Sequence, residues 1–153
     1  MTHYVAIDIG GTNIKYGLID QEGQLVESHE MPTEAHKGGP YILQKTKDIV
    51  ASYLEKDPVA GVAISSAGMV DPDKGEIFYA GPQIPNYAGT QFKKEIETSF
   101  NIPCEIENDV NCAGLAEAVS GSGKGASVTL CLTIGTGIGG CLIMDGKVFH
   151  GFS

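Results

Sequence analysis

Residues 7–20 read IDIGGTNIKYGLID, and residues 131–144 read CLTIGTGIGGCLIM. Each stretch has an apolar run, a glycine-rich turn and a second apolar run, which is typical of two strands joined by a turn. Residues of the first stretch recur at equivalent places in the second, where Gly11, Thr12, Ile14, Leu18 and Ile19 become Gly135, Thr136, Ile138, Leu142 and Ile143. Because the turn is used twice, we expect two similar lobes that each contribute one glycine turn to a shared cleft.

The patterns outside the turns extend this repeat to the architecture. Apolar and helical periodicities predict strands at 4–9, 13–19, 25–31, 59–64 and 104–107, helices at 41–54, 90–100 and 109–119, and a short hairpin within 68–89. Strands at 128–134 and 138–144 then begin the series again. We therefore predict an α/β fold with a mixed β-sheet flanked by helices over 1–120, a Gly/Ser-rich junction at 121–126, and the opening strands of a second lobe over 127–153.

The composition describes an acidic globular chain. Hydrophobic residues make up 42% of 153, which is enough for a core, and the formal net charge is −9. Lys and Arg number only ten and are scattered, whereas a nucleic-acid surface needs clustered cations. The sequence shows no signal peptide and no apolar run of about 20 residues. We therefore expect a cytoplasmic protein that binds neither nucleic acid nor a membrane.

The first glycine turn has the features of a phosphate-binding loop. Glycine permits a positive φ and close approach of a ligand, and successive N–H groups can hold phosphate oxygens. Thr12 adds a hydroxyl and Lys15 a positive charge, while Asp8 is well placed to hold the waters of a magnesium ion. A plain β-hairpin turn is the better interpretation of either copy alone. Two copies, with an acid before the first, favour phosphate binding.

A second group of polar residues lies at Glu107-Asn108-Asp109, where a predicted strand passes into a predicted helix. A carboxylate near the positive end of a helix stays ionised, which suits a base that accepts a hydroxyl proton during phosphoryl transfer. Asn108 offers both a donor and an acceptor to sugar hydroxyls. From this segment alone, however, an N-cap role for Asn108 or Asp109 is the favoured interpretation. The loop at 65–71 and Asn86 equally fit a polar pocket or simple turn chemistry.

Five segments, read together, resemble the ROK family: DIGGTNIK at 8–15, SAGMVD at 66–71, PNYAG at 85–89, ENDVN at 107–111 and IGTGIGG at 134–140. That family contains bacterial sugar kinases and sugar-responsive repressors on the actin/hexokinase-like, ribonuclease-H-like fold. The segments occur in order along the whole chain, so the resemblance rests on their combination. It implies that this chain has the same fold.

The resemblance also implies a role for each matching residue. Asp109 would be the catalytic base on a sugar hydroxyl, and the sugar would be contacted by Gly68, Asn86, Asn108 and Asp109. ATP would be bound by a first phosphate motif formed by Asp8, Gly10, Gly11, Thr12, Asn13 and Lys15, and a second formed by Gly135, Thr136 and Gly137. Asp8 would also hold Mg²⁺ through water.

Members of the family continue for roughly the same length again. The resemblance therefore implies that the chain is a fragment of an ATP-dependent hexose kinase, inactive alone and homodimeric at full length. The family's Glu-x-Gly-His sugar segment, adenosine pocket and frequent zinc-holding cysteine cluster would lie in the missing part. The four cysteines here lack metal-ligand spacing and do not support zinc. The alternative is a sugar-sensing regulator without kinase activity, but no helix-turn-helix precedes the first strand.

Overall fold

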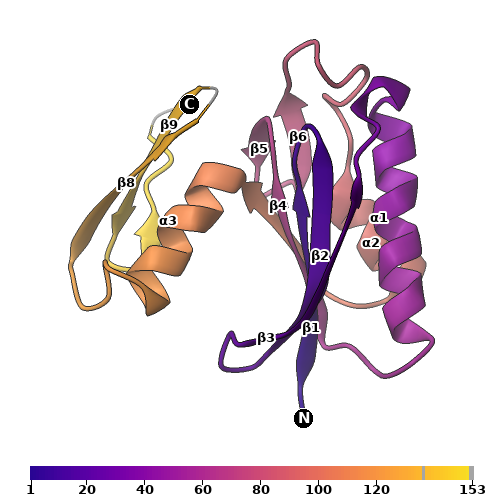
Figure 1. Ribbon diagram of the computed structural model, residues 1–153, viewed down its shortest axis with the longest axis horizontal. Helices are drawn as coiled ribbons and strands as arrows, with labels where there is room; N and C mark the ends of the chain where they lie inside the picture. The colour runs from indigo at the N-terminus through magenta and orange to yellow at the C-terminus, as the bar shows by residue number, and fades with distance from the viewer. Residues whose placement is uncertain (136, 152–153) are drawn as a thin grey trace. The chain divides into compact units, whose positions relative to one another are not determined.

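The computed structural model describes residues 1–135 and 137–151 (Figure 1). These residues form two compact units, which we call unit 1 (Met1–Glu107) and unit 2 (from Asn108 onward). The sequence predicted a junction later in the chain, at 121–126. The difference concerns one helix, which the structure includes in unit 2.

A five-stranded mixed sheet forms the centre of unit 1. Its strands are β1 (His3–Ile9), β2 (Asn13–Asp20), β3 (Leu25–Pro32), β4 (Gly61–Ser66) and β7 (Cys104–Asn108), in the order β3-β2-β1-β4-β7. The first three strands form an antiparallel meander, and β1 pairs in parallel with β4. A parallel pair needs a long crossover connection, which is provided here by helix α1 (Gly39–Leu54).

The core of unit 1 lies between this sheet and its helices. Val5, Ile7 and Ile9 alternate along β1 and are buried in one cluster with Ile42 and Ile49 of α1. Helix α2 (Phe92–Phe100) lies beside α1 and adds buried side chains to the same cluster (Figure 1). The alternation leaves the intervening residues of β1 on the opposite face of the sheet. The predicted mixed sheet with flanking helices is therefore confirmed for this unit.

The connections differ in detail from the sequence pattern. The predicted hairpin is present as β5 (Met69–Asp71) and β6 (Glu76–Tyr79), and a 3₁₀ turn, η1 (Ala35–Lys37), precedes α1. The predicted helix at 90–100 begins two residues later, at Phe92, with Gln91 as its N-cap. The Thr90 hydroxyl donates to the carbonyl of Tyr87 at 2.6 Å. Thr90 therefore stabilises the preceding loop.

Unit 2 consists of one helix against a small antiparallel sheet. Helix α3 (Asp109–Ser120) contacts strands β8 (Val128–Ile134), β9 (Ile138–Met144) and β10 (Lys147–Val148), which lie in the order β10-β9-β8. Gly114 is buried in this contact, where an added Cβ would lie 2.2 Å from the Cys141 sulfur. The absence of a side chain at Gly114 lets α3 approach the sheet closely. This packing explains why α3 belongs to unit 2.

The other face of this small sheet is apolar and exposed. Side chains alternate between faces along each strand, so residues next to Cys131 and Cys141 point away from α3. Leu130 and Ile134 on this face are 67% and 81% exposed. The full set of large exposed side chains on β8 and β9 is Val128, Leu130, Leu132, Ile134, Ile138 and Met144. The sheet of unit 2 is thus covered by described residues on one face only.

Glu34 gives unit 1 an acid-sensitive contact at the start of α1. Its carboxylate accepts a hydrogen bond from the Tyr41 hydroxyl and pairs with Lys45 at 2.9 Å and Lys37 at 3.2 Å. The bond from Tyr41, followed by those from the two lysines, lowers the pKa of Glu34 from 4.5 to about 2. A carboxylate with a lowered pKa contributes stability above its ordinary pKa, and this contribution is lost as the pH falls through the lowered value.

We therefore expect Glu34→Gln to reduce the melting temperature near neutral pH and to have less effect as the pH falls from about 4.5 to about 2. Thermal unfolding across that range, followed by circular dichroism, measures the difference between variant and parent. The exposed Glu30 on β3 provides a matched control, as Glu30→Gln. A difference for Glu34→Gln that stays constant over this pH range would show that its charge does not stabilise the fold.

Candidate functional site

Two hydrogen bonds from Thr33 fix the turn that joins β1 to β2. The Thr33 N–H donates to the carbonyl of Thr12 at 2.8 Å, and the Thr33 hydroxyl donates to the carbonyl of Gly10 at 2.7 Å. The Gly10 N–H also donates to the carbonyl of Asn13 at 3.0 Å. Thr33 is 0% exposed, so these bonds are shielded from water. Sequence reasoning missed Thr33, whose only signal is a hydroxyl directly after the last residue of β3.

Neither glycine of this turn is needed for a positive φ, and only Gly10 is closely packed. We expected φ > 0, but neither Gly10 nor Gly11 lies in the left-handed region. A Cβ added at Gly10 would lie 3.0 Å from the carbonyl oxygen of Asn13, whereas one at Gly11 would meet nothing within 4 Å. Gly11 and Thr12 are exposed, and no backbone carbonyl in the described part of the chain accepts from their N–H groups. The turn thus presents two N–H groups to a ligand.

Asp8 lies beside this turn in a polar row across the sheet. The strand register places it opposite Lys15 of β2 on one side and Ser65 of β4 on the other. The Ser65 hydroxyl donates to Asp8 Oδ1 at 2.8 Å. Asp8 is exposed because it lies on the face opposite the core. Side chains directly opposite each other on adjacent strands point to the same face of the sheet, so Lys15, Asp8 and Ser65 can contact one ligand.

An exposed carboxylate at this place fits a magnesium ion bound with phosphate. Mg²⁺ keeps several waters and is usually held by one or two carboxylates plus phosphate oxygens. Asp8 meets this requirement through its second oxygen, since Oδ1 accepts from Ser65. Within the described ranges, no group of three or more His, Cys, Asp or Glu forms a metal cage. The residues therefore fit a metal that arrives with a phosphate ligand.

Gly68 and Asn86 both occupy unusual backbone positions in unit 1. Gly68 has φ 90°, and a Cβ there would lie 3.0 Å from the Tyr79 carbonyl oxygen, so glycine is required. Asn86 has φ 54° and is exposed. Its carbonyl oxygen lies 2.1 Å from the place that a Cβ of Gly39 would occupy, so the loop rests directly on the start of α1. Asn86 also lines a cavity of about 290 Å³ between this loop and α1.

A buried hydroxyl pair fixes the loop that carries Asn86. The Ser66 and Tyr87 oxygens are 2.6 Å apart, and both side chains are buried. Burial raises the pKa of Tyr87 above its ordinary range, so the phenol stays protonated and can take part in a neutral hydrogen bond. Ser66 ends β4 and Tyr87 follows Asn86 directly. This pair therefore ties the loop of Asn86 to the sheet.

Asn108 and Asp109 form the start of α3 in unit 2. Asn108 Oδ1 accepts from the N–H groups of Val110 at 3.0 Å and Asn111 at 3.3 Å, so Asn108 is the N-cap. Asp109 is the first residue of the helix, is exposed, and has one oxygen 2.8 Å from the Val110 nitrogen. The cap interpretation that the segment alone favoured is confirmed for Asn108.

The second glycine turn joins β8 to β9, as the first joins β1 to β2. The Gly135 N–H donates to the carbonyl of Gly137 at 2.9 Å, and a Cβ at either glycine would meet nothing within 4 Å. Thr136, predicted with them as a phosphate contact, lies outside the described residues. Three residues separate the paired Ile134 and Ile138, whereas four separate Ile9 and Ile14. The repeat is therefore similar in architecture but not identical in turn length.

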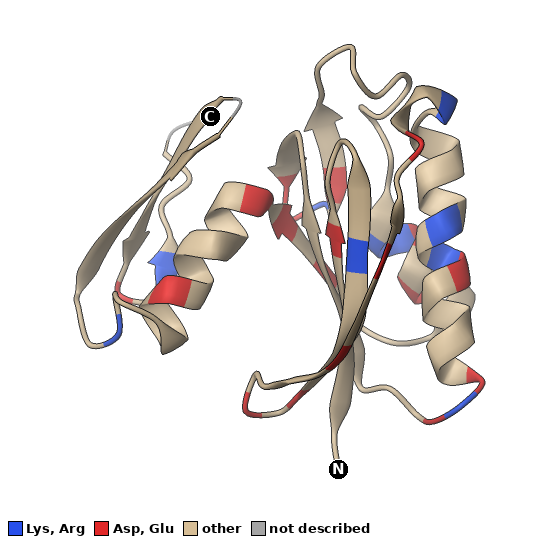
Figure 2. Ribbon diagram, in the orientation of Figure 1, with Lys and Arg blue, Asp and Glu red and all other residues tan. Residues whose placement is uncertain are grey.

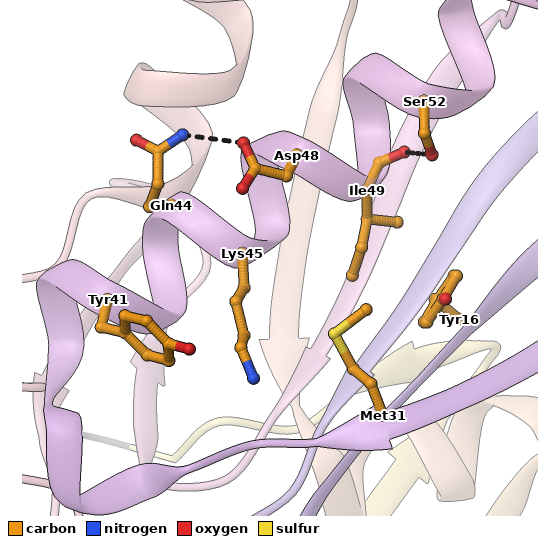
Figure 3. Close-up of a pocket in the computed structure, with 8 residues that line it drawn as sticks. All are labelled: Tyr16, Met31, Tyr41, Gln44, Lys45, Asp48, Ile49 and Ser52. Carbon is orange, nitrogen blue, oxygen red and sulfur yellow. Dashed lines mark hydrogen bonds between the residues drawn. The ribbon is translucent and has the colours of Figure 1, made fainter.

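A groove of unit 1 beside α1 is lined by none of these residues. It measures about 430 Å³ and is lined by Tyr16, Met31, Tyr41, Gln44, Lys45, Asp48, Ile49 and Ser52 (Figure 3). Gln44 donates to Asp48 at 2.9 Å, and Ser52 donates to the carbonyl of Ile49 at 2.7 Å. None of the lining residues was predicted as a site residue. This groove is therefore not part of the candidate site.

Lysines and acidic residues both occur in unit 1 and in unit 2 (Figure 2). The described helices include none that is long and apolar enough to cross a membrane.

Comparison with known proteins agrees with the resemblance of the sequence. Residues 4–153 match the ROK family over almost the whole chain. The chain belongs to the ROK family. It is 55% identical over 150 residues to an uncharacterized protein of Clostridium perfringens, covering 98% of this chain and 51% of that protein. It is 32% identical over 155 residues to a glucokinase of Halalkalibacterium halodurans, covering 97% of this chain and 46% of the relative.

Solved ROK structures have the same fold. The ROK glucokinase of Streptomyces griseus, solved with glucose and AMPPNP, matches with a TM-score of 0.84 and 30% identity, covering 98% of this chain and 47% of that one. The predicted actin/hexokinase-like fold class is confirmed. A ROK transcriptional regulator related to the Escherichia coli MLC protein, at 18% identity and a TM-score of 0.83, shares the fold alone. This chain of the ROK family spans about half the length of the curated relatives it matches.

Proposed function

We propose that the protein to which this chain belongs is an ATP-dependent hexose kinase. The observation that carries the proposal is the anchored turn at 10–12, which presents the Gly11 and Thr12 N–H groups beside the exposed carboxylate of Asp8. Amides and a carboxylate together suit a nucleotide phosphate and its metal. The named ROK relatives include glucokinases, which supports the same reaction here.

Asp109 is the proposed catalytic base. The sugar hydroxyl would lose its proton to the Asp109 carboxylate as its oxygen forms a bond to the γ-phosphorus of ATP. The bond between that phosphorus and the bridging oxygen then breaks, and ADP leaves. The position of Asp109 at the N-terminus of α3 supports this role, because the helix end keeps the carboxylate ionised before the proton arrives.

The remaining site residues would bind and orient the two substrates. Asn108 uses its oxygen for the helix cap, so we propose that its amide nitrogen donates to the sugar. Gly68 and Asn86 would contact the sugar from loops whose backbone is fixed by close packing. The phosphates would be held by Gly10, Gly11, Thr12, Asn13 and Lys15, and by Gly135, Thr136 and Gly137. When bound, Mg²⁺ would neutralise phosphate charge, and Asp8 would hold its waters.

A regulator that senses sugar without phosphorylating it is the alternative. The two functions differ in whether ADP is formed. The intact protein should therefore be titrated with ATP and a panel of glucose, N-acetylmannosamine, mannose, allose, fructose and a β-glucoside in a coupled ADP assay. Saturable ADP formation with at least one sugar supports the kinase. Sugar binding by calorimetry without ADP formation from any of them would contradict it.

The open space around Gly11 gives a specific test of the phosphate turn. A Cβ at Gly11 would meet nothing within 4 Å and the backbone there has no positive φ, so we expect the fold to tolerate Gly11→Val. Its side chain would keep phosphate oxygens away from the N–H groups of the turn. Losing a hydrogen bond to a charged group costs about 1.5–3 kcal/mol, so we expect the KM for ATP to rise about 10–100-fold.

Sugar affinity of Gly11→Val, measured without nucleotide, serves as the control and should stay unchanged. An unaltered KM for ATP would exclude the turn from the nucleotide site. A parallel loss of sugar affinity and melting temperature would instead indicate a folding defect.

A further inference from the structure

Two cysteines of unit 2 lie directly opposite each other. Cys131 of β8 pairs with Cys141 of β9 in an antiparallel register without irregularity. The Asp145 N–H donates to the carbonyl of Ser127 at 2.8 Å, and hydrogen-bonded pairs recur at every second residue. Cys131 and Cys141 are therefore a hydrogen-bonded pair, whose Cα atoms lie about 5.5 Å apart. This separation is within the range of about 4.4–6.8 Å that a disulfide can span.

Both side chains point to the same side of the sheet. An added Cβ at Gly114 of α3 would lie 2.2 Å from the Cys141 sulfur and 3.4 Å from the Cys131 Cβ. Both cysteine side chains therefore lie next to Gly114 of α3. Neither cysteine is part of a disulfide in the structure.

Solvent reaches this pair from one side. Cys131 is partly exposed and lines a cavity of about 540 Å³, together with Glu117, Ser122 and Thr129. Cys141 is only 8% exposed. A small oxidant can therefore meet Cys131 first, and the buried Cys141 directly opposite it on β9 can then resolve the product. A reactive, accessible thiol beside a resolving one is the usual arrangement of redox-sensitive cysteines.

We propose that Cys131 and Cys141 are an oxidation site, which a peroxide converts into a reversible cross-strand disulfide. The Cys131 thiolate attacks the peroxide oxygen, which gives a sulfenic acid and releases water when the peroxide is hydrogen peroxide. The Cys141 sulfur then attacks the Cys131 sulfur and expels a second water. Two thiols are oxidised and one hydrogen peroxide is reduced to two waters. A dithiol returns the pair to the reduced state.

The bridge would act on the first turn of α3. In the reduced state the Cys141 thiol donates to the carbonyl of Val110 at 3.3 Å. Disulfide formation removes this S–H donor and draws the sulfur towards β8. Val110 follows Asp109 in the chain, and its N–H binds the oxygens of Asn108 and Asp109. Oxidation is therefore expected to loosen the helix start that carries these residues.

The other cysteines are less suited to this chemistry. Cys104 is fully buried in unit 1, and burial raises the pKa of its thiol to about 12, so little reactive thiolate forms. Cys112 lies on α3 and is partly buried. Cys112 could form a disulfide with Cys131 or Cys141 instead, so the test must distinguish these bridges from the proposed one.

The positions of the lysines make the test direct. Trypsin cleaves after Lys94, Lys124 and Lys147, so Cys131 and Cys141 fall in one peptide, 125–147, while Cys104 and Cys112 fall in 95–124. The intact reduced protein is treated with hydrogen peroxide, alkylated and digested without reductant. We expect peptide 125–147 to lose two hydrogens, to escape alkylation, and to recover both alkylation sites after dithiothreitol. Amide hydrogen exchange in the first turn of α3 should rise at least several-fold in the oxidised protein and return on reduction.

Matched variants complete the test. Cys131→Ser and Cys141→Ala should each abolish the bridged peptide, whereas Cys112→Ser should retain it. The proposal fails if peptide 125–147 remains fully alkylated, or if it becomes linked to 95–124 instead. It also fails if the bridge forms equally fast in denaturant, because the folded register would then contribute nothing. Unchanged exchange at α3 in a fully bridged sample would overturn the effect on the helix.

Discussion

Asp109→Asn should reduce kcat of the intact kinase about 10²–10⁴-fold while sugar affinity changes little. An asparagine at this place cannot accept the hydroxyl proton, but its oxygen can still accept from the Val110 N–H, which Asp109 binds at 2.8 Å. The N-cap itself is Asn108, which the substitution leaves intact. The helix should therefore persist, and the loss should appear in turnover rather than in folding.

Steady-state kinetics and calorimetric sugar titration of the same preparation separate the two effects. Asp145→Asn gives the same chemical change on the exposed hairpin between β9 and β10, at a left-handed residue that asparagine tolerates. It should keep parental kinetics. If Asp109→Asn also keeps near-parental kcat, Asp109 only assists the helix start, and another group must take the proton.

The strands of unit 1 could be predicted because their burial alternates with the residue number. Val5, Ile7 and Ile9 face the core, so the period of two in β1 is visible in the sequence. The turn at 145–146 follows an equally local rule, because Asp145 and Gly146 both adopt a positive φ that Asp-Gly pairs favour. In both places a local rule and the tertiary structure agree.

Two features of unit 1 could not be predicted: the hydrogen bonds from Thr33 to the turn at 10–12, and the end of the unit at Glu107. Both depend on contacts between segments that are distant in the sequence. Thr33 binds the turn at 10–12 across a gap in sequence, and a threonine after a strand has no pattern of its own. The glycine-rich segment 121–126 suggested a junction, but the packing of Gly114 against Cys141 joins α3 to the strands that follow. Composition marks where a chain can bend, whereas contacts decide which elements pack together.

In the candidate site, too, the local structure could be predicted from the sequence but the chemistry could not. Asn108 and Asp109 at a strand-to-helix transition predicted a cap, and the cap is present. Their proposed chemistry depends on bound substrates, so it follows from family resemblance and not from local pattern. At Gly10 and Gly11 the expected positive φ was wrong, because neither residue adopts it; the close carbonyl oxygen of Asn13 explains the glycine at position 10 only.

Gly114→Val should destabilise unit 2 by about 1–3 kcal/mol, because a side chain there overpacks the contact between α3 and the sheet. Its Cβ would lie 2.2 Å from the Cys141 sulfur and 3.4 Å from Ile143. Amide hydrogen exchange of α3 is the suitable measurement, since two units need not unfold together. Ala116→Val, at an exposed position of the same helix, adds the same branched side chain and should cost only a few tenths of a kcal/mol.

The cause can be isolated with a double-mutant cycle. Gly114→Ala adds only the Cβ, and in an open helix it would stabilise by about 1 kcal/mol because alanine is the better helix former. Here the Cys141 sulfur occupies that space, so the single variant should be destabilised. Cys141→Ala removes the sulfur, and the pair should be more stable than the separate effects predict, with a coupling of about 0.5–3 kcal/mol. Additive effects, or a stabilising Gly114→Ala, would mean that α3 does not rest on β9 at this point.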